Sequence, residues 1–189
     1  MFRFKFTLRE MTLIGVLAAL VFAASMIQIM IPTPIDGTRI HLGNIMCLLA
    51  GFLLGPIGGG LAAGIGSMFY DFTNPIFIES APYTLVFKFL MAFVCGVISW
   101  AGGAEAKKMR RNIIAACCGA IFYVILYLGK SFVTNVFFDR MEIQTVMISI
   151  STKAVISTIN GIIAATVSVP LAKVVQQALL RSGVYPQNR

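Results

Sequence analysis

Charged residues are scarce in this chain of 189 residues, since only 12% are Asp, Glu, Lys or Arg whereas 58% are hydrophobic. A soluble domain has roughly 25% charged and about 45–50% apolar residues. The residues that would make a water-facing surface are therefore missing. This composition excludes a soluble globular enzyme, and it excludes disordered, collagen-like and disulfide-rich chains as well. What remains is an integral membrane protein built almost entirely of spanning segments.

Residues that carry chemistry are also few. The chain has one histidine, and its four cysteines lie inside apolar stretches without a C-x-x-C spacing or a neighbouring histidine. Cys47, Cys95, Cys117 and Cys118 are therefore expected to be packing residues rather than zinc ligands or disulfide partners. Paired carboxylates and an HExxH sequence are lacking. The glycine run at 55–60 is not a phosphate loop, because no Lys-Ser/Thr follows it. We therefore expect that this chain is not an enzyme and that it binds no metal and no cofactor.

The apolar runs predict an all-α integral membrane protein with six transmembrane helices in a single domain, residues 1–189. The expected spans are residues 10–31, 42–54, 57–72, 83–101, 112–137 and 146–169, followed by an amphipathic tail over 170–182. Pro170 is expected to kink this last helix and Gly183 to end it. The short second and third helices, each ~20–24 Å long against a hydrocarbon core of about 30 Å, are divided by Gly55-Pro56. Such interrupted apolar segments mark the substrate site in many transporters.

The distribution of charge predicts the orientation of these spans. Ten of the fifteen cations fall on one side, at Arg3, Lys5, Arg9, Lys107, Lys108, Arg110, Arg111, Lys173, Arg181 and Arg189. The opposite loops hold only Arg39 and Arg140, and five of the seven acids lie there or at that rim, at Asp36, Asp71, Glu79, Asp139 and Glu142. Cytoplasmic loops carry an excess of Lys and Arg, so both termini are predicted to be cytoplasmic. The net charge of +8 is then a matter of topology and does not indicate nucleic-acid binding.

Three lysines lie inside predicted spans, where a charged centre costs about 2.5–3.5 kcal/mol. Lys88, Lys130 and Lys153 come from different spans, each roughly 8–11 Å below the outer boundary. Any one of them could snorkel to the outer surface or pair with Asp71 to hold helices together. Three at a similar depth favour a polar pocket that opens outward. The candidate substrate-binding set adds the polar residues of the same layer and comprises Arg39, His41, Asn44, Asp71, Tyr83, Lys88, Lys130, Lys153 and Asn160.

Two further groups of residues have alternative interpretations. His41 lacks clustered partners for a metal or a proton relay, so it is expected to hydrogen-bond the ligand or a loop. Aromatic residues near the outer ends of the spans either stack on a ring of the ligand or anchor the helices at the interface, and these are Phe69, Tyr70, Phe77, Phe87 and Phe89.

Small residues recur at four-residue spacing along the first span, at Gly15, Ala19 and Ala23. Small side chains on one helix face let another helix approach closely in lipid. This stripe is either an internal packing surface or a docking surface for a partner protein.

Several motifs follow one another in the first 100 residues. They are Arg39-x-His41-Leu42-Gly43-Asn44, then LLGPIGG over 53–59, then Ala63-Gly64-Ile65-Gly66-Ser67 with Asp71, and finally Pro82 with Leu85-Val86-Phe87-Lys88. In their order the chain resembles the substrate-binding S components of energy-coupling factor (ECF) vitamin transporters. It is most similar to the group that carries riboflavin, pyridoxine and hydroxymethylpyrimidine, and the resemblance in topology extends over the whole chain.

This resemblance implies a subunit that binds a water-soluble vitamin or precursor on its outer face and releases it inside after docking. The implied partners are a transmembrane coupling subunit and two cytoplasmic ATPases, which use the ATP, and the implied location is the bacterial cytoplasmic membrane. The stripe at Gly15, Ala19 and Ala23 is similar to the docking motif Ala-x-x-x-Ala of the family. The segment Thr33–His41 matches a loop that often gates the pocket in the family.

The identity of the vitamin stays open. If the three lysines converge, their positive charge exceeds that of Asp71 and favours a ligand with a carboxylate or electron-rich oxygens, such as pantothenate or a pterin. The resemblance instead favours pyridoxine, hydroxymethylpyrimidine or riboflavin. The alternative function is a self-sufficient small secondary transporter or channel, in which the same lysines form an ion path.

Overall fold

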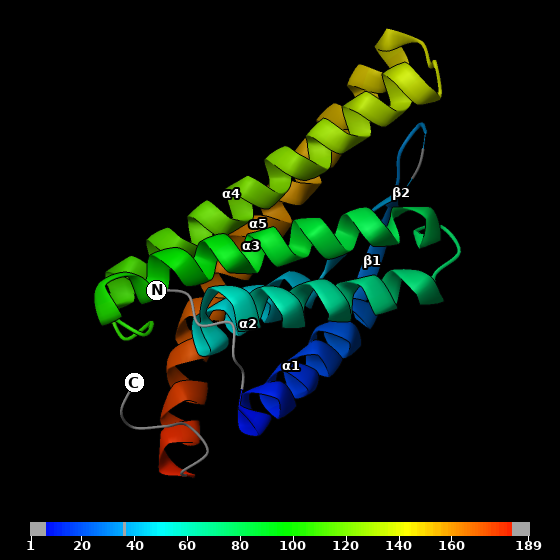
Figure 1. Cartoon of the computed structure of the whole chain (residues 1–189). Coiled ribbons are helices and arrows are strands. Elements are labelled where there is room, and N and C mark those ends of the chain that lie inside the picture. Colours follow the sequence, from blue (N-terminus) through cyan, green and yellow to red (C-terminus); the bar gives the residue numbers. More distant parts are fainter. Residues whose placement is uncertain (1–6, 36, 183–189) are drawn as a thin grey trace.

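The computed structural model describes residues 7–35 and 37–182, and 83% of these residues are helical. Its long helices are α1 (Leu8–Met26), α2 (Gly43–Thr73), α3 (Ala81–Trp100), α4 (Met109–Val133) and α5 (Ile143–Arg181) (Figure 1). A hairpin of β1 (Gln28–Pro32) and β2 (Gly37–His41) joins α1 to α2, and single helical turns occur at η1 (Ile78–Ser80), η2 (Ala101–Gly103) and η3 (Thr134–Phe138). Within this part of the chain, five helices are long and apolar enough to cross a membrane. The predicted roles of Arg3, Lys5, Asp36, Gly183 and Arg189 fall outside the described residues.

A sharp break at Gly55 divides α2 into two halves. Gly55 has φ 73° and ψ −166°, a backbone conformation that residues with a side chain rarely adopt, and Pro56 follows it. The halves run antiparallel, because Sγ of Cys47 and Oγ of Ser67 lie 3.6 Å apart although 20 residues separate them. A straight helix would hold these atoms about 30 Å apart. The two halves correspond to the short segments predicted over 42–54 and 57–72.

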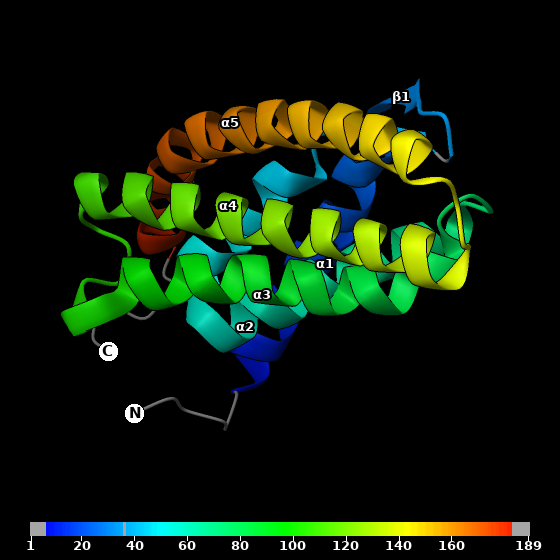
Figure 2. The same cartoon turned by 90° about the horizontal axis from the view of Figure 1, so that it is seen from above.

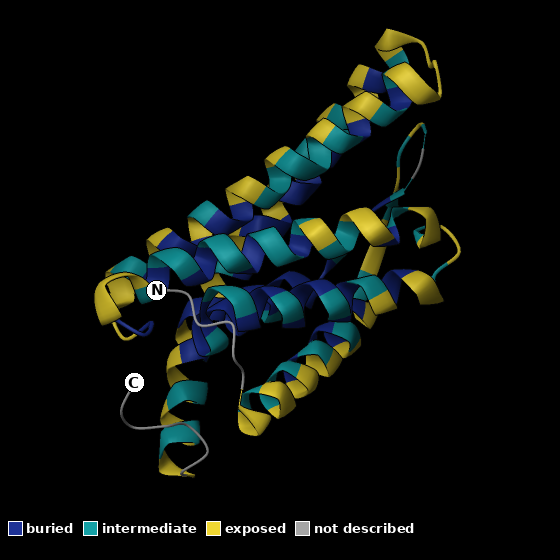
Figure 3. Cartoon of the chain, viewed as in Figure 1, coloured by how far each residue is buried: buried dark blue, intermediate teal, exposed yellow. Residues whose placement is uncertain are grey.

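Glycine allows the two halves of α2 to touch. A Cβ at Gly59 would lie 2.6 Å from the carbonyl oxygen of Ala50 and from Cα of Gly51, closer than any side chain can come. α3 approaches the same helix equally closely, since a Cβ at Gly51 would lie 2.6 Å from the carbonyl oxygen of Ala92. α2 therefore lies at the centre of the molecule, with 72% of its most apolar stretch buried, against 17% for α1 (Figure 3).

The chain departs from the predicted helices between residues 27 and 41. α1 ends at Met26, whereas the predicted first span continues to residue 31. Ile27 is already extended, at φ −84° and ψ 93°, and β1 then pairs antiparallel with β2, with Gln28 opposite His41 and Met30 opposite Arg39. Isoleucine at alternate positions 27, 29 and 31, followed by Pro32, suits a strand better than a helix. The first predicted span is therefore too long, and the predicted loop is a β-hairpin.

α4 and α5 form a long antiparallel pair that lies across α3 and reaches beyond it (Figures 1 and 2). The predicted last span and tail form one continuous helix, α5, which contains Pro170 and bends toward its C-terminal end (Figure 1).

The turns gather at two opposite ends of the molecule. The start of α1, the α3–α4 turn and the end of α5 lie at one end, and the hairpin and the α2–α3 and α4–α5 turns lie at the other (Figures 1 and 2). The basic segment over 107–111 thus belongs to the first end, whereas the acids Asp71, Glu79, Asp139 and Glu142 belong to the second.

Candidate functional site

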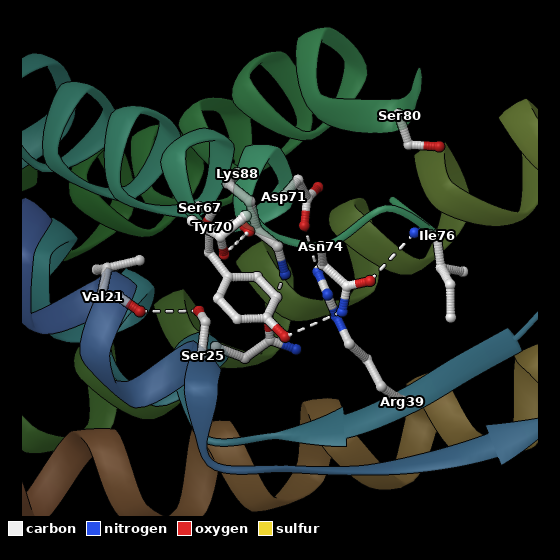
Figure 4. A network of polar contacts seen from close by, with 12 residues as sticks. Val21, Ser25, Arg39, Ser67, Tyr70, Asp71, Asn74, Ile76, Ser80 and Lys88 are labelled. Carbon is white, nitrogen blue, oxygen red and sulfur yellow. Dashed lines mark hydrogen bonds and ion pairs between the residues drawn. The ribbon is translucent and has the colours of Figure 1, made fainter. Parts of the chain in front are cut away.

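An ion pair connects the hairpin to α2. Arg39 of β2 donates from Nη2 to Oδ1 of Asp71 at 2.6 Å, and the side chain of Asp71 is only 1% exposed (Figure 4). The guanidinium carbon of Arg39 lies 4.7 Å from the ring centre of Tyr70 and 4.0 Å from that of Phe77. Two of the aromatic residues predicted to face a ligand or the interface thus hold Arg39 in place. Charge and ring contacts together fix the direction of its guanidinium.

Lys88 of α3 lies inside the helix bundle, with 2% of its surface exposed. Its ammonium donates a hydrogen bond to Oδ1 of Asn44 in α2, and it lies 3.6 Å from the ring centre of Tyr123 in α4. Three helices thus surround this charge. Lys88 does not snorkel to the surface of the molecule, because its charged end is enclosed by polar and aromatic partners.

Lys153 of α5 is buried as well, and it lies at the other end of the same aromatic group. Its Nζ donates to Oγ of Ser131 at 2.7 Å and lies 5.9 Å from the ring centre of Tyr127. Tyr123 and Tyr127 stack with ring centres 6.0 Å apart. Lys88 and Lys153 therefore flank one pair of stacked tyrosines.

Lys130 has different surroundings. It donates to Oγ of Ser80 in η1 at 3.2 Å, and its Nζ lies 5.3 Å from the ring centre of Tyr83. Tyr83 is 52% exposed. The structure brings two of the three predicted lysines to one aromatic pair and places the third with Tyr83, toward the α2–α3 turn.

The remaining predicted residues lie around the hairpin. Asn160 of α5 donates to the carbonyl oxygen of Arg39 at 3.4 Å, and the hydroxyl of Tyr127 donates to Oγ1 of Thr38 at 3.5 Å. β2 therefore contacts α2 through the side chain of Arg39. It contacts α4 through the side chain of Thr38, and α5 through the backbone carbonyl of Arg39. β2 therefore connects these three helices.

His41 follows at the end of β2 and is buried. Burial lowers its pKa well below the ordinary value of 6.5, and the charges of Lys88 and Arg39 lower it further. Its imidazole is therefore neutral at neutral pH. Within the residues that the structure describes, Nδ1 of His41 has no hydrogen-bond partner.

Sequence reasoning missed the tyrosines of α4. Tyr123, Tyr127, Ser131 and Asn135 recur at four-residue spacing, which puts polar side chains along one face of an apolar helix. α5 carries a comparable row of buried polar residues at Ser149, Lys153, Ser157 and Asn160. A search for polar residues at helical spacing within the spans would have found both rows.

The stripe of small residues on α1 faces outward. Gly15, Ala19 and Ala23 are all exposed, and a Cβ at Gly15 would meet nothing within 4 Å. Of the two interpretations given above, internal packing does not describe this face in the described part of the chain.

The arrangement is suited to binding rather than to covalent chemistry. N–H donors from Arg39 and Lys88, a neutral imidazole and stacked aromatic rings meet where the hairpin crosses the helices. Such groups hold a small polar ligand through hydrogen bonds and ring contacts.

The amino-acid sequence of this chain is similar to those of known proteins. A family model described as ECF-type riboflavin transporter, S component, matches residues 5–177. A protein of Pyrococcus woesei, described as an uncharacterized protein in gap 3'region, is 29% identical over 103 residues, which cover 54% of this chain and 66% of that protein. The match thus spans just under two thirds of the length of this curated relative.

Proposed function

This chain belongs to the family of ECF-type riboflavin transporter S components, and on that basis we propose that it binds a water-soluble vitamin or precursor for an ECF importer. The candidate classes are riboflavin, pyridoxine, hydroxymethylpyrimidine and pantothenate. The family match over residues 5–177 carries the proposal. Members of this family are substrate-binding components of transporters and not enzymes. The family does not favour a self-sufficient secondary transporter or channel.

The chain is a multi-pass membrane protein, and in our proposal it crosses the cell membrane six times with both termini in the cytoplasm. The two antiparallel halves of α2 are then the second and third spans. The separation of charge supports this orientation, because the basic α3–α4 turn and the acidic α2–α3 and α4–α5 turns lie at opposite ends. The hairpin belongs to the acidic, outer end.

We place the vitamin against the polar cluster at the outer end, where the hairpin meets the helices. The proposed contacts are Arg39, His41, Asn44, Asp71, Tyr83, Lys88, Lys130, Lys153 and Asn160. The burial of Lys88 and Lys153 supports this site, since lysines kept inside an apolar bundle usually have a function there. The hairpin would have to loosen from α2 for the ligand to enter, which makes the Arg39–Asp71 ion pair part of the entry step.

The proposed partners are a transmembrane coupling subunit and two cytoplasmic ATPases. The coupling subunit docks on the exposed stripe of Gly15, Ala19 and Ala23, and the vitamin is released inside after docking. ATP is used by the ATPases, and this chain needs no cofactor of its own.

Purification of the chain tests the proposal directly. Mass spectrometry of small molecules that remain bound through purification should identify a vitamin, and the same compound should raise the melting temperature of the protein. Lys130→Met together with Lys153→Met should weaken that binding in a folded protein. Transport of a solute by the chain alone in liposomes, driven by an ion gradient without ATP, would contradict the proposal.

A further inference from the structure

We propose that the substrate carries an anionic oxygen group, a carboxylate or a phosphate, which the site binds between Arg39 and Lys88. The inference rests on the proposed function, because it takes this cluster as the vitamin site. It goes further by restricting the ligand to the charged members of the vitamin and precursor classes. Figure 4 shows the two side chains reaching toward one another, Arg39 from β2 and Lys88 from α3.

The first observation is that only one of the two terminal nitrogens of the Arg39 guanidinium has a hydrogen-bond partner among the described residues. An arginine that pairs with a carboxylate commonly makes two parallel N–H···O bonds. Here Nη2 alone reaches Asp71, and Nη1 is buried without a hydrogen-bond partner among the residues described. A buried N–H group without an acceptor is unfavourable. An oxygen of the ligand would supply the missing acceptor.

The aromatic neighbours of Arg39 prevent the group from turning away. Tyr70 and Phe77 lie within 5 Å of the guanidinium carbon, as measured by their ring centres at 4.7 and 4.0 Å. Because Asp71 holds Nη2 and the rings hold the plane, Nη1 keeps a fixed direction. A fixed donor selects for a ligand group with an oxygen in one position.

The second observation is the balance of charge. Arg39 and Lys88 are cationic, and Asp71 is the acid that pairs with this cluster. The other ion pair in the described part of the chain, Lys107 with Glu105, belongs to the α3–α4 turn at the opposite end. Lys88 has neutral partners, the amide of Asn44 and the ring of Tyr123. Arg39, Lys88 and Asp71 together thus carry one more positive than negative charge.

His41 does not change this balance. It lies near enough to Lys88 and Arg39 that their charges lower its pKa, and its burial lowers the pKa more. A third cation is therefore absent from this position at neutral pH. An anionic group of the ligand would offset this excess positive charge, and a buried site of low polarity strongly favours a compensated cation over an uncompensated one.

Matched pairs of ligands test the proposal on the unsubstituted chain of 189 residues in detergent. Each pair joins a charged compound to a neutral analogue: pantothenate with pantothenol, nicotinate with nicotinamide, pyridoxal phosphate with pyridoxal, and flavin mononucleotide with riboflavin. Calorimetry should show that in the pair that binds, the anion binds tighter by about tenfold or more. The carboxylate and phosphate pairs distinguish the two sources of charge. Equal affinity within the pair, or tighter binding of the neutral member, would overturn the inference.

Variants connect the preference to the two cations. Lys88→Met keeps the volume of the side chain, and the double variant Arg39→Gln with Asp71→Asn removes the ion pair without leaving a buried lone charge. Each should reduce the preference for the anion by about tenfold, whereas Lys108→Met, an exposed lysine of the α3–α4 turn, should leave it unchanged. A preference that persists in both site variants would overturn the inference.

The outcomes separate this inference from the proposed function. If riboflavin or pyridoxal binds at least as tightly as its phosphate ester, the proposed function stands and the anionic ligand is refuted. Failure of every compound to bind, together with failure to purify with a coupling subunit, would contradict both.

Discussion

Arg39 and Asp71 are 32 residues apart in the chain, and their side chains form an ion pair of 2.6 Å between β2 and the second half of α2. Asp71 is almost fully enclosed, and the guanidinium of Arg39 lies against two aromatic rings. The pair is therefore a connection that the rest of the site depends on, because it holds the hairpin against the helices.

We expect Arg39→Gln to destabilise the protein, because it leaves the carboxylate of Asp71 buried without its cation. Removing one partner of a buried ion pair costs about 3–5 kcal/mol. Chemical unfolding in detergent should measure this loss.

The double variant Arg39→Gln with Asp71→Asn is the control for this prediction. It removes both charges and lets the two amides hydrogen-bond, so most of the lost stability should return. If the double variant is as unstable as the sum of the two single variants, the two charges are not coupled and the contact matters only for packing.

Two glycines that both lie inside helices should respond in opposite ways to alanine. Gly59→Ala places a Cβ 2.6 Å from the backbone of the other half of α2, and backbone cannot move aside cheaply, so we expect a loss of about 1–3 kcal/mol. Gly129 of α4 is exposed and a Cβ there meets nothing within 4 Å. Gly129→Ala should raise stability by up to about 1 kcal/mol through helix propensity. Equal effects of the two substitutions in thermal unfolding would contradict the antiparallel packing of the two halves.

Sequence reasoning found the break in α2 because its signal is local. Gly55 and Pro56 interrupt the helix by their own backbone properties, and the apolar runs on either side give the lengths of the halves. The hairpin escaped the same reasoning because hydropathy does not distinguish a short apolar strand from the end of an apolar helix. Alternation of isoleucine over 27–31 was the available signal.

The site was predictable only in part. A lysine inside an apolar run is visible in the sequence, and Lys88 and Lys153 are indeed buried. Which side chains contact one another depends on the rotation of each helix about its axis. The position of a residue along the helix does not determine this rotation. Lys130 precedes Ser131 by one residue and points to a different face, toward Ser80, whereas Ser131 contacts Lys153.

The stability of the protein should fall at acid pH through His41. Burial and the charges of Lys88 and Arg39 lower its pKa in the folded state, whereas the unfolded chain takes up the proton near pH 6.5. The unfolded state therefore binds more protons below about pH 6.5, and the free energy of unfolding should fall by about 1.4 kcal/mol per pH unit until the folded-state pKa is reached. Above about pH 7 this contribution is constant.

His41→Gln isolates this effect, because His41 is the one histidine of the chain. Unfolding of the wild type and of the variant should be measured between pH 5 and pH 8. The slope in this range should be missing from the variant. A wild-type slope that survives in His41→Gln would assign the acid sensitivity to the carboxylates instead.

Substitutions on the outward face of α1 should prevent assembly with the partner subunits without affecting ligand binding. Gly15→Leu and Ala19→Leu add bulk to an exposed surface, where a Cβ at Gly15 has nothing within 4 Å, so the isolated chain should keep its melting temperature. A partner helix packed on that stripe would be forced away, because small residues are what permits close approach in lipid. Both variants should therefore bind the vitamin but fail to purify with the coupling subunit and ATPases. Gly129→Leu on α4 is the matched control and should retain the complex. Loss of the complex in the control alone would move the docking surface from α1 to α4.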